Sequence, residues 1–327
     1  MRIWKRSICA LLVLCLFICM IGCGEQNVKS EWTMEGETVL HADLVFHILN
    51  YINIEGSPAN TYSKEYINQF EEFRAERSNN EYKLIEEAQK LSAPYKKYFS
   101  EVSQVAFIGF YCSSYEELKD HLNNLPLSIG AREEFIKPFI ECMDAELSLY
   151  TEYWSGVIAE QENNMNKFIS YSNKELYSFE KLFKYANKKP HYYFCVSLEP
   201  GKGRGINNND QLMSAAGCIP KNKEEQQLYA FFQAFHEMTH QITDNKLFTN
   251  ISMEDGTHLL SENVVMKTDY YLIQKFNKGG LKEYIQWTAW LEGISEASEQ
   301  DFLDYYILSE KEEKEIQKMI DEIASIS

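Results

Sequence analysis

The segment from Lys223 to Ile242 constrains the fold more than any other part of the chain. It contains no proline, and apolar side chains flank its centre on both sides. Glu224 and Glu225 stand at its start, where the positive end of a helix dipole favours acids. We therefore expect a helix here. The spacing of four between His236 and His240 then places both imidazoles on one face, about one turn apart.

These two histidines belong to the pentapeptide His236-Glu237-Met238-Thr239-His240, an H-E-x-x-H motif. Two imidazoles so placed can bind one Zn²⁺ from the same side. Glu237 would lie where it can polarise a metal-bound water and pass the proton to a departing amine. The motif resembles the active helix of zinc metallopeptidases of the zincin group. That resemblance implies one zinc ion per chain and hydrolysis of peptide bonds, with Glu237 as general base and then acid.

A catalytic zinc needs a third protein ligand and one open position. A second helix is expected from about Thr257 to Phe276, and it carries Glu262, 22 positions after His240. This arrangement resembles the gluzincin subgroup, in which a glutamate on a second helix completes a His-His-Glu site. Asp269 follows seven residues later on the same helical face, where it could hydrogen-bond a ligand imidazole.

Other residues compete for these roles. Glu292, beside a glycine, also resembles a gluzincin ligand, Asp269 itself could be a ligand as in aspzincins, and His258 would be a third histidine. A donor to the oxyanion of the transition state is also expected. Tyr270, Tyr271 and His258 are the candidates for that role.

The chain changes character near residue 190. His191–Leu198 and Gln211–Ile219 are predicted as strands, with a glycine- and asparagine-rich loop over Glu199–Asp210 between them. In zincins a strand beside the active helix pairs with the substrate backbone, so either strand could take that part by strand addition.

The rest of the chain is predicted to be helical. Only 15 Gly and 7 Pro occur in 327 residues, and apolar residues recur at helical spacing over 39–189, including Glu133–Ala159 and Met165–Tyr185. We expect an α+β protein that is predominantly α-helical. A helical subdomain over residues 39–189 would precede a zincin-like core over residues 190–327, which ends in further helices.

The N-terminus predicts export. Three basic residues precede the apolar stretch Ile8–Ile21, which is too short for an ordinary membrane span. The following Cys23, in Met20-Ile21-Gly22-Cys23, resembles the lipidated cysteine of a bacterial lipoprotein. Residues 1–22 are then a signal peptide, residues 23–38 a tether, and the chain is anchored outside the cytoplasm through a lipid on Cys23. A plain signal peptide or an uncleaved anchor is the alternative.

The composition bears on partners and redox state. The net charge of −17 disfavours nucleic-acid binding, because such a surface repels phosphates. Four cysteines besides Cys23 lie in the exported part, and in an oxidising compartment they form two disulfides or remain four buried thiols. These are Cys112, Cys142, Cys195 and Cys218.

Two functions from different classes follow. The first is a membrane-anchored extracytoplasmic zinc metallopeptidase that acts on a peptide or protein. The second is a non-enzymatic surface lipoprotein that binds a ligand and carries a structural or inactive metal site. An accidental motif in a helical surface protein is a third reading, and absence of stoichiometric metal would favour it.

Overall fold

The computed structural model describes residues 31–52, 64–77, 84–199, 203–207, 210–221, 223–247 and 257–327. Trp32–Ser327 forms one compact unit. The signal peptide and Cys23 lie outside the described residues. As predicted, the described part is α+β and mostly helical, with one small sheet.

Short helices build the N-terminal half around a core that contains Phe46, Phe70 and Phe139. The helices are α2 (Leu40–Tyr51), α3 (Lys64–Glu76), α4 (Leu84–Lys90), α5 (Ser92–Lys97), α6 (Phe99–Val102), α7 (Val105–Ile108), α8 (Tyr115–Asn124) and α9 (Ile129–Ala131).

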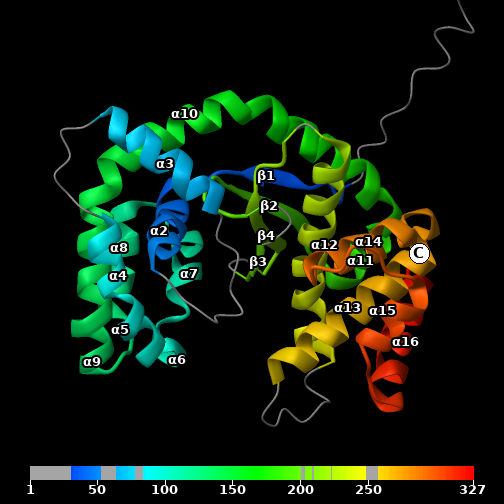
Figure 1. The fold of residues 1–327 in the computed structure, drawn as a ribbon. Coiled ribbons are helices and arrows are strands. Elements are labelled where there is room, and N and C mark those ends of the chain that lie inside the picture. Colours follow the sequence, from blue (N-terminus) through cyan, green and yellow to red (C-terminus); the bar gives the residue numbers. More distant parts are fainter. Residues whose placement is uncertain are drawn as a thin grey trace, which may run out of the picture. The chain divides into compact units, whose positions relative to one another are not determined.

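A single helix of 40 residues, α10 (Lys137–Leu176), follows these helices (Figure 1). It covers most of the first predicted stretch, Glu133–Ala159, and continues into the second, Met165–Tyr185, because no helix breaker stands between them. The second stretch ends in a 3₁₀ turn and a separate short helix. A π-helical turn, Arg132–Ile136, precedes it. The short helix α11 (Glu180–Ala186) ends at Asn187, whose φ of 52° stops the helix before the sheet.

The sheet has four strands in the order β1-β2-β4-β3. β1 (Glu35–Glu37), β2 (Lys189–Cys195) and β4 (Leu212–Cys218) are parallel, and β3 (Gly203–Ile206) is antiparallel to β4. Two of these strands differ from the prediction. β3 lies within the expected loop Glu199–Asp210, and β1 lies within residues assigned to the tether. Both are very short and acquire their structure from pairing with a longer strand.

The sheet separates two apolar cores. Side chains alternate along a strand, so Tyr193 and Cys195 of β2 face the N-terminal core while Tyr192 and Phe194 face the other way. The second core lies between the sheet and the C-terminal helices. These are α12 (Glu224–Lys246), α13 (Thr257–Phe276), α14 (Leu281–Leu291), α15 (Glu299–Tyr305) and α16 (Glu310–Ser325).

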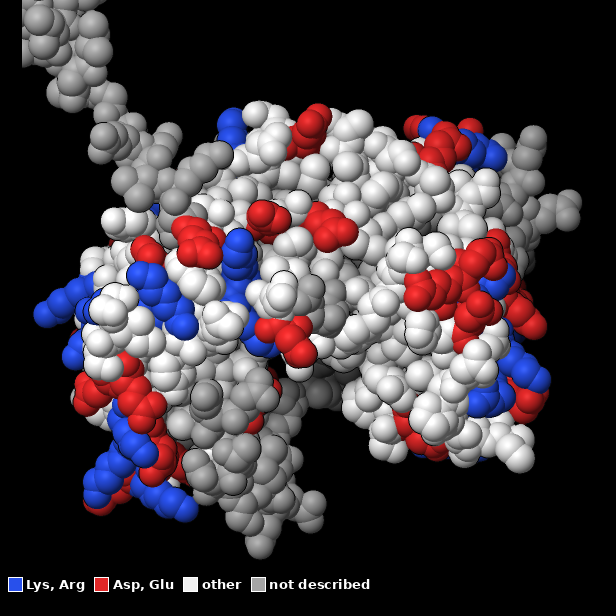
Figure 2. All heavy atoms as spheres, turned by 180° about the vertical axis from the view of Figure 1, so that it is seen from behind, with Lys and Arg blue, Asp and Glu red and all other residues white. Residues whose placement is uncertain are grey.

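Three further findings concern the surface and the cysteines. Cys112, Cys142, Cys195 and Cys218 are buried thiols that form no disulfide, the second of the two alternatives left open by the sequence. Among the described residues, no helix has both the length and the apolar character needed to cross a membrane. On the face drawn in Figure 2, lysines and arginines are interspersed with acids, and uncharged side chains separate the charged groups.

Candidate metal centre

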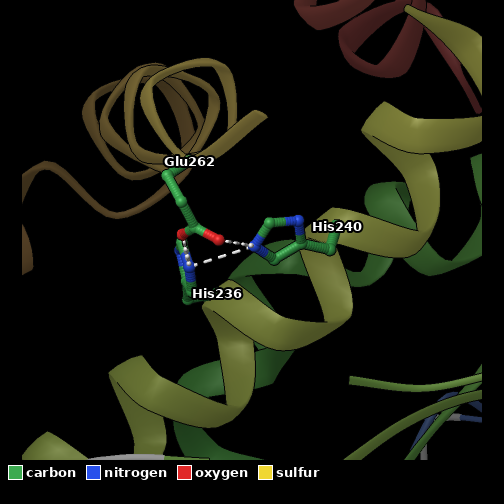
Figure 3. Close-up of side chains that lie close together, drawn as sticks. All are labelled: His236, His240 and Glu262. Carbon is green, nitrogen blue, oxygen red and sulfur yellow. Dashed lines mark hydrogen bonds and ion pairs between the residues drawn. The ribbon is translucent and has the colours of Figure 1, made fainter. Parts of the chain in front are cut away.

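Helix α12 is fixed against the sheet by one polar side chain and several apolar ones. Phe231 and Phe235 are buried in the second core. The side-chain amide of Gln241 donates hydrogen bonds to the backbone carbonyls of Ser214 at 2.8 Å and Ile206 at 3.4 Å. These bonds tie the helix to β4 and β3. The same bonds fix the rotation of α12 about its own axis, so that His236 and His240 point toward Glu262 of α13 (Figure 3).

Helix α13 brings two carboxylates to His236. Glu262 and Asp269 lie seven residues apart and share one face of the helix, as the sequence predicts. Glu262 Oε2 is 3.3 Å from His236 Nε2, and Asp269 Oδ2 is 3.0 Å from His236 Nδ1. Asp269 therefore orients the ring and leaves Nε2 directed at Glu262.

His240 completes a group of three residues that could hold a metal ion (Figure 3). Its Nε2 is 3.2 Å from His236 Nε2 and 3.5 Å from Glu262 Oε1. Bonds of about 2.0–2.1 Å in a tetrahedral zinc site would hold ligand atoms about 3.3 Å apart. The two imidazoles and the carboxylate therefore already have the spacing and the chemistry of zinc ligands.

The close approach of these groups shifts their pKa values. Burial opposes the charged form of His236, but hydrogen bonds to Asp269 and Glu262 outweigh it and raise the pKa of His236 to about 10. The pKa of His240 rises to about 9, because Asp244 and Glu262 likewise outweigh burial. The same contacts with the two histidines outweigh burial at Glu262 and lower the pKa of its carboxyl. Three carboxylates, those of Glu262, Asp269 and Asp244, thus favour positive charge on the two imidazoles.

Two aromatic side chains that the sequence did not single out support the centre. The hydroxyl of Tyr284 donates to Asp269 Oδ2 at 3.4 Å, and the ring of Trp287 lies 6.0 Å from that of His236. Both are buried residues of α14, three positions apart. Their spacing of three predicts that both lie on one face of a helix. The local sequence does not predict which other helix packs against that face.

The edge strand β3 passes directly over Glu237, the predicted general base. A Cβ on Gly205 would lie 3.0 Å from the backbone oxygen of Glu237 and 3.4 Å from its Oε2. A Cβ on Gly203 would clash with Gln233 of the same helix. Glycines at alternate positions therefore allow the strand to approach α12 closely. The alternating glycines were the only sequence feature that we identify as pointing to strand β3.

The other sequence candidates lie elsewhere. Glu292 accepts a hydrogen bond from the hydroxyl of Tyr305 at 2.8 Å and is not part of the metal-binding group. Tyr270 donates its hydroxyl to Glu299, and Tyr271 donates to Glu313 at 2.6 Å. A role for Tyr270 in the transition state stays a prediction. His258 lies in the first turn of α13, and its side chain is outside the described residues.

The access of solvent to the centre is uneven. His236 is 8% exposed, His240 is 17% exposed and Glu262 is 33% exposed. The centre is therefore closed around His236 and opens toward Glu262 and His240. A ligand from solution could reach it from that side.

Comparison with known proteins gives no relative. No family model matches the chain, and no curated protein or solved structure is significantly similar to it. The class of protein is therefore defined by its own features: an α+β chain, mostly helical, with a candidate His-His-Glu metal centre beside the edge of a small sheet.

Proposed function

We propose that this chain is a membrane-anchored extracytoplasmic zinc metallopeptidase. The observation that carries the proposal is the convergence of three side chains. The two Nε2 atoms are 3.2 Å apart, His236 Nε2 is 3.3 Å from Glu262 Oε2, and His240 Nε2 is 3.5 Å from Glu262 Oε1, with Glu237 on the same helix as both histidines. A fully closed structural zinc site has four protein ligands. The group found among the described residues has three, which is the number in catalytic sites.

Zinc held by His236, His240 and Glu262 would supply Lewis-acid chemistry, lowering the pKa of water and polarising a carbonyl. Glu237 would accept the proton of the attacking water and deliver it to the departing amine. Asp269 would hold the ring of His236 in the tautomer whose Nε2 lone pair faces the metal. Each role falls on a side chain of α12 or α13.

The backbone of an extended peptide would pair with β3. β2 lies between β1 and β4, and β4 lies between β2 and β3, so the central residues of both strands expected from the sequence are already paired on two sides. β3 is the edge strand nearest Glu237. Pairing with it would place a substrate carbonyl beside the metal centre by strand addition.

The anchor would be a lipid on Cys23, which follows the apolar stretch Ile8–Ile21. It would hold the enzyme on the outer side of a bacterial membrane, where its substrates are peptides or proteins of the cell envelope. Metabolic labelling with a radioactive fatty acid, compared between wild type and Cys23→Ser, tests this part separately. We expect the label to be absent from the variant.

The decisive experiment compares Glu237→Gln with wild type. We expect about one zinc per chain in both, measured by elemental analysis, and hydrolysis of a fluorogenic peptide library by wild type only, because the amide cannot accept the proton. Full activity of Glu237→Gln would exclude the mechanism. Zinc binding without hydrolysis in wild type would favour a ligand-binding lipoprotein with an inactive metal site.

A further inference from the structure

The segment that carries the edge strand β3 is held at both ends by the N-terminal helical half. It starts at Val196 and Ser197, directly after β2, and its last strand residue is Ile206. Side chains alternate along a strand, so Ile206 points away from α12, the helix that Gly205 faces. Ile206 is fully buried in the N-terminal core. The helical half therefore contacts the proposed substrate edge on the side opposite α12.

Asp43 of α2 forms the first anchor. Its side chain is fully buried and accepts hydrogen bonds from the backbone N–H of Val196 at 2.6 Å and of Ser197 at 3.3 Å. It also accepts from the hydroxyl of Ser197 and, at 3.1 Å, from the indole N–H of Trp154 on α10. One carboxylate thus joins α2, α10 and the end of β2.

The chemistry around Asp43 requires a carboxylate at this position. All four of these groups donate, and an ionised carboxylate only accepts, whereas the NH₂ of an amide would face other donors. Burial raises the pKa of Asp43, and the bonds from Ser197 and Val196 oppose that shift. The side-chain amide of Asn50, also on α2, donates to the carbonyl of Ser197 at 3.0 Å. Both backbone polar groups of Ser197 are therefore held by α2.

The second anchor, Ile206, lies one residue from the point where β3 meets Glu237. A Cβ on Gly205 would be 3.4 Å from Glu237 Oε2, and the carbonyl of Ile206 accepts from Gln241 at 3.4 Å. Within the described part of the chain, this strand of four residues pairs with β4 alone. So short a strand depends on side-chain contacts for its place. A shift at either anchor would move the edge relative to the metal centre.

We propose that Asp43 is a positioning residue for the proposed peptidase: it holds the segment of β3 in place beside Glu237. The N-terminal helical half is thereby part of the apparatus that binds substrate. The inference rests on the proposed function and names its substrate class, extended peptides that pair with several positions of β3.

The first arm of the test measures the order of β3 directly and does not depend on turnover. Amide hydrogen exchange of the full chain is followed by mass spectrometry, on peptides that report β3 and α12 separately. In Asp43→Asn we expect the β3 amides to exchange on the order of tenfold faster, while the α12 amides around His236 remain protected as in wild type. Ser197→Ala removes one of the four bonds and should give a weaker form of the same pattern. It decides the question if Asp43→Asn does not fold.

Two controls separate this effect from a general loss of stability. Asp144→Asn makes the same chemical change at an exposed site of α10, where the carboxylate accepts from the hydroxyl of Tyr115 at 2.7 Å. Leu122→Ala removes a fully buried side chain of α8 from the same core. Neither should speed exchange in β3 selectively. Unchanged β3 exchange in Asp43→Asn, or equal acceleration in β3 and α12, overturns the proposal.

The second arm measures turnover of two peptides by the zinc-loaded enzyme. One is a substrate of about ten residues found in the peptide library, and the other is its central dipeptide with blocked ends. For the long peptide we expect Asp43→Asn to raise KM about fivefold and to leave kcat within about twofold, because backbone pairing with β3 is weakened. The KM of the dipeptide and the zinc content should remain as in wild type, as should the kinetics of Asp144→Asn and Leu122→Ala.

These outcomes distinguish failure of the inference from failure of the proposed function. An unchanged KM for the long peptide in Asp43→Asn overturns the substrate assignment even if the enzyme is active. An equal rise in KM for both peptides also overturns it, because pairing with β3 would not be the cause. If zinc-loaded wild type hydrolyses neither peptide, the proposed function fails and the substrate assignment fails with it. Hydrogen exchange then decides alone whether Asp43 positions β3.

Discussion

Two buried clusters of histidine and carboxylate lie on opposite sides of the sheet, and they differ in how their charge is balanced. His47 of α2 and Glu146 of α10 are both fully buried in the N-terminal core. His236 and Glu262 form the corresponding pair in the C-terminal half. The residue types and the separations are similar, yet only the second pair belongs to a candidate metal group.

The N-terminal cluster supplies its own cation. Arg74 donates two hydrogen bonds to Glu146, at 2.9 and 2.6 Å. His47 places Nε2 3.5 Å from the same carboxylate, and its Nδ1 is hydrogen-bonded to Tyr66. Burial lowers the pKa of His47 despite the nearby acid. Both carboxylate oxygens of Glu146 are hydrogen-bonded to Arg74, so this carboxylate is already directed at a cation that belongs to the chain.

The C-terminal cluster is arranged differently. The ring nitrogens of His236 and His240 and the carboxylate oxygens of Glu262 face one another. The two clusters teach that a histidine beside a carboxylate is not by itself a metal site. What distinguishes the candidate metal group is a third possible ligand, His240, where the other cluster has a cationic partner for its carboxylate, Arg74.

The largest expected effect is on folding, in the N-terminal cluster. Arg74→Met leaves the Glu146 carboxylate buried beside only a neutral imidazole, so we expect a loss of about 3 kcal/mol of stability, measured by urea unfolding. Replacing both residues, as Arg74→Met with Glu146→Leu, should restore most of it, because no buried charge remains. Zinc content should not change in either variant. A loss of zinc in either would contradict the separation of the two clusters.

The second effect concerns zinc. Glu262→Ala should weaken zinc binding by on the order of a hundredfold, since zinc sites of four ligands bind with about 10–16 kcal/mol in total. Glu292→Ala is the matched control, because that glutamate is bonded to tyrosines and is outside the metal group. Competition with a chromophoric chelator measures both. Equal affinities for the two variants would refute Glu262 as a ligand.

A smaller effect on zinc affinity is expected from Asp269, which contacts a ligand imidazole rather than the metal position itself. Asp269→Asn removes the charge that orients His236 and should reduce zinc affinity by about 10–100-fold. The control is Asp244→Asn, whose carboxylate is 55% exposed and 3.9 Å from His240 Nδ1. There we expect less than a threefold change. An Asp244 variant as weak as the Asp269 variant would mean that orientation of His236 is not what matters.

The sequence predicted the parts of the site that depend on helical periodicity. The spacing of four brings His236 and His240 together, and the spacing of seven brings Glu262 and Asp269 to one face. Both are local properties of single helices, so the helical repeat of 3.6 residues per turn is enough to predict them. Which helix meets which is a tertiary property. The resemblance to gluzincins led us to expect Glu262 opposite the motif, and the structure brings Glu262 close to both histidines.

The parts that escaped prediction depend on contacts between distant segments. β3 has four residues, two of them glycine, and exists because it pairs with β4 and passes close over α12. Tyr284 reaches Asp269 only because α14 packs on α13. The balanced cluster of Arg74 and Glu146 joins residues 72 positions apart. No local pattern encodes any of these pairings.

The smallest expected effect is on the pH dependence of stability in the absence of metal. A rise in pH should change the free energy of unfolding in opposite directions through the two clusters. The folded pKa of His236, about 10, lies above its ordinary 6.5, so its stabilisation is complete below pH 6.5 and is lost as pH rises through 10. His47 has a lowered pKa, so its cluster instead loses stability as pH falls below 6.5. With a chelator present, we expect a decline on the order of 1 kcal/mol between pH 7 and 10 in wild type. His236→Gln should show a smaller decline, because only His240, whose pKa is raised to about 9, then still loses a stabilising charge; urea unfolding at each pH measures the difference. An equal alkaline decline in both proteins would show that His236 is not charged in the metal-free fold.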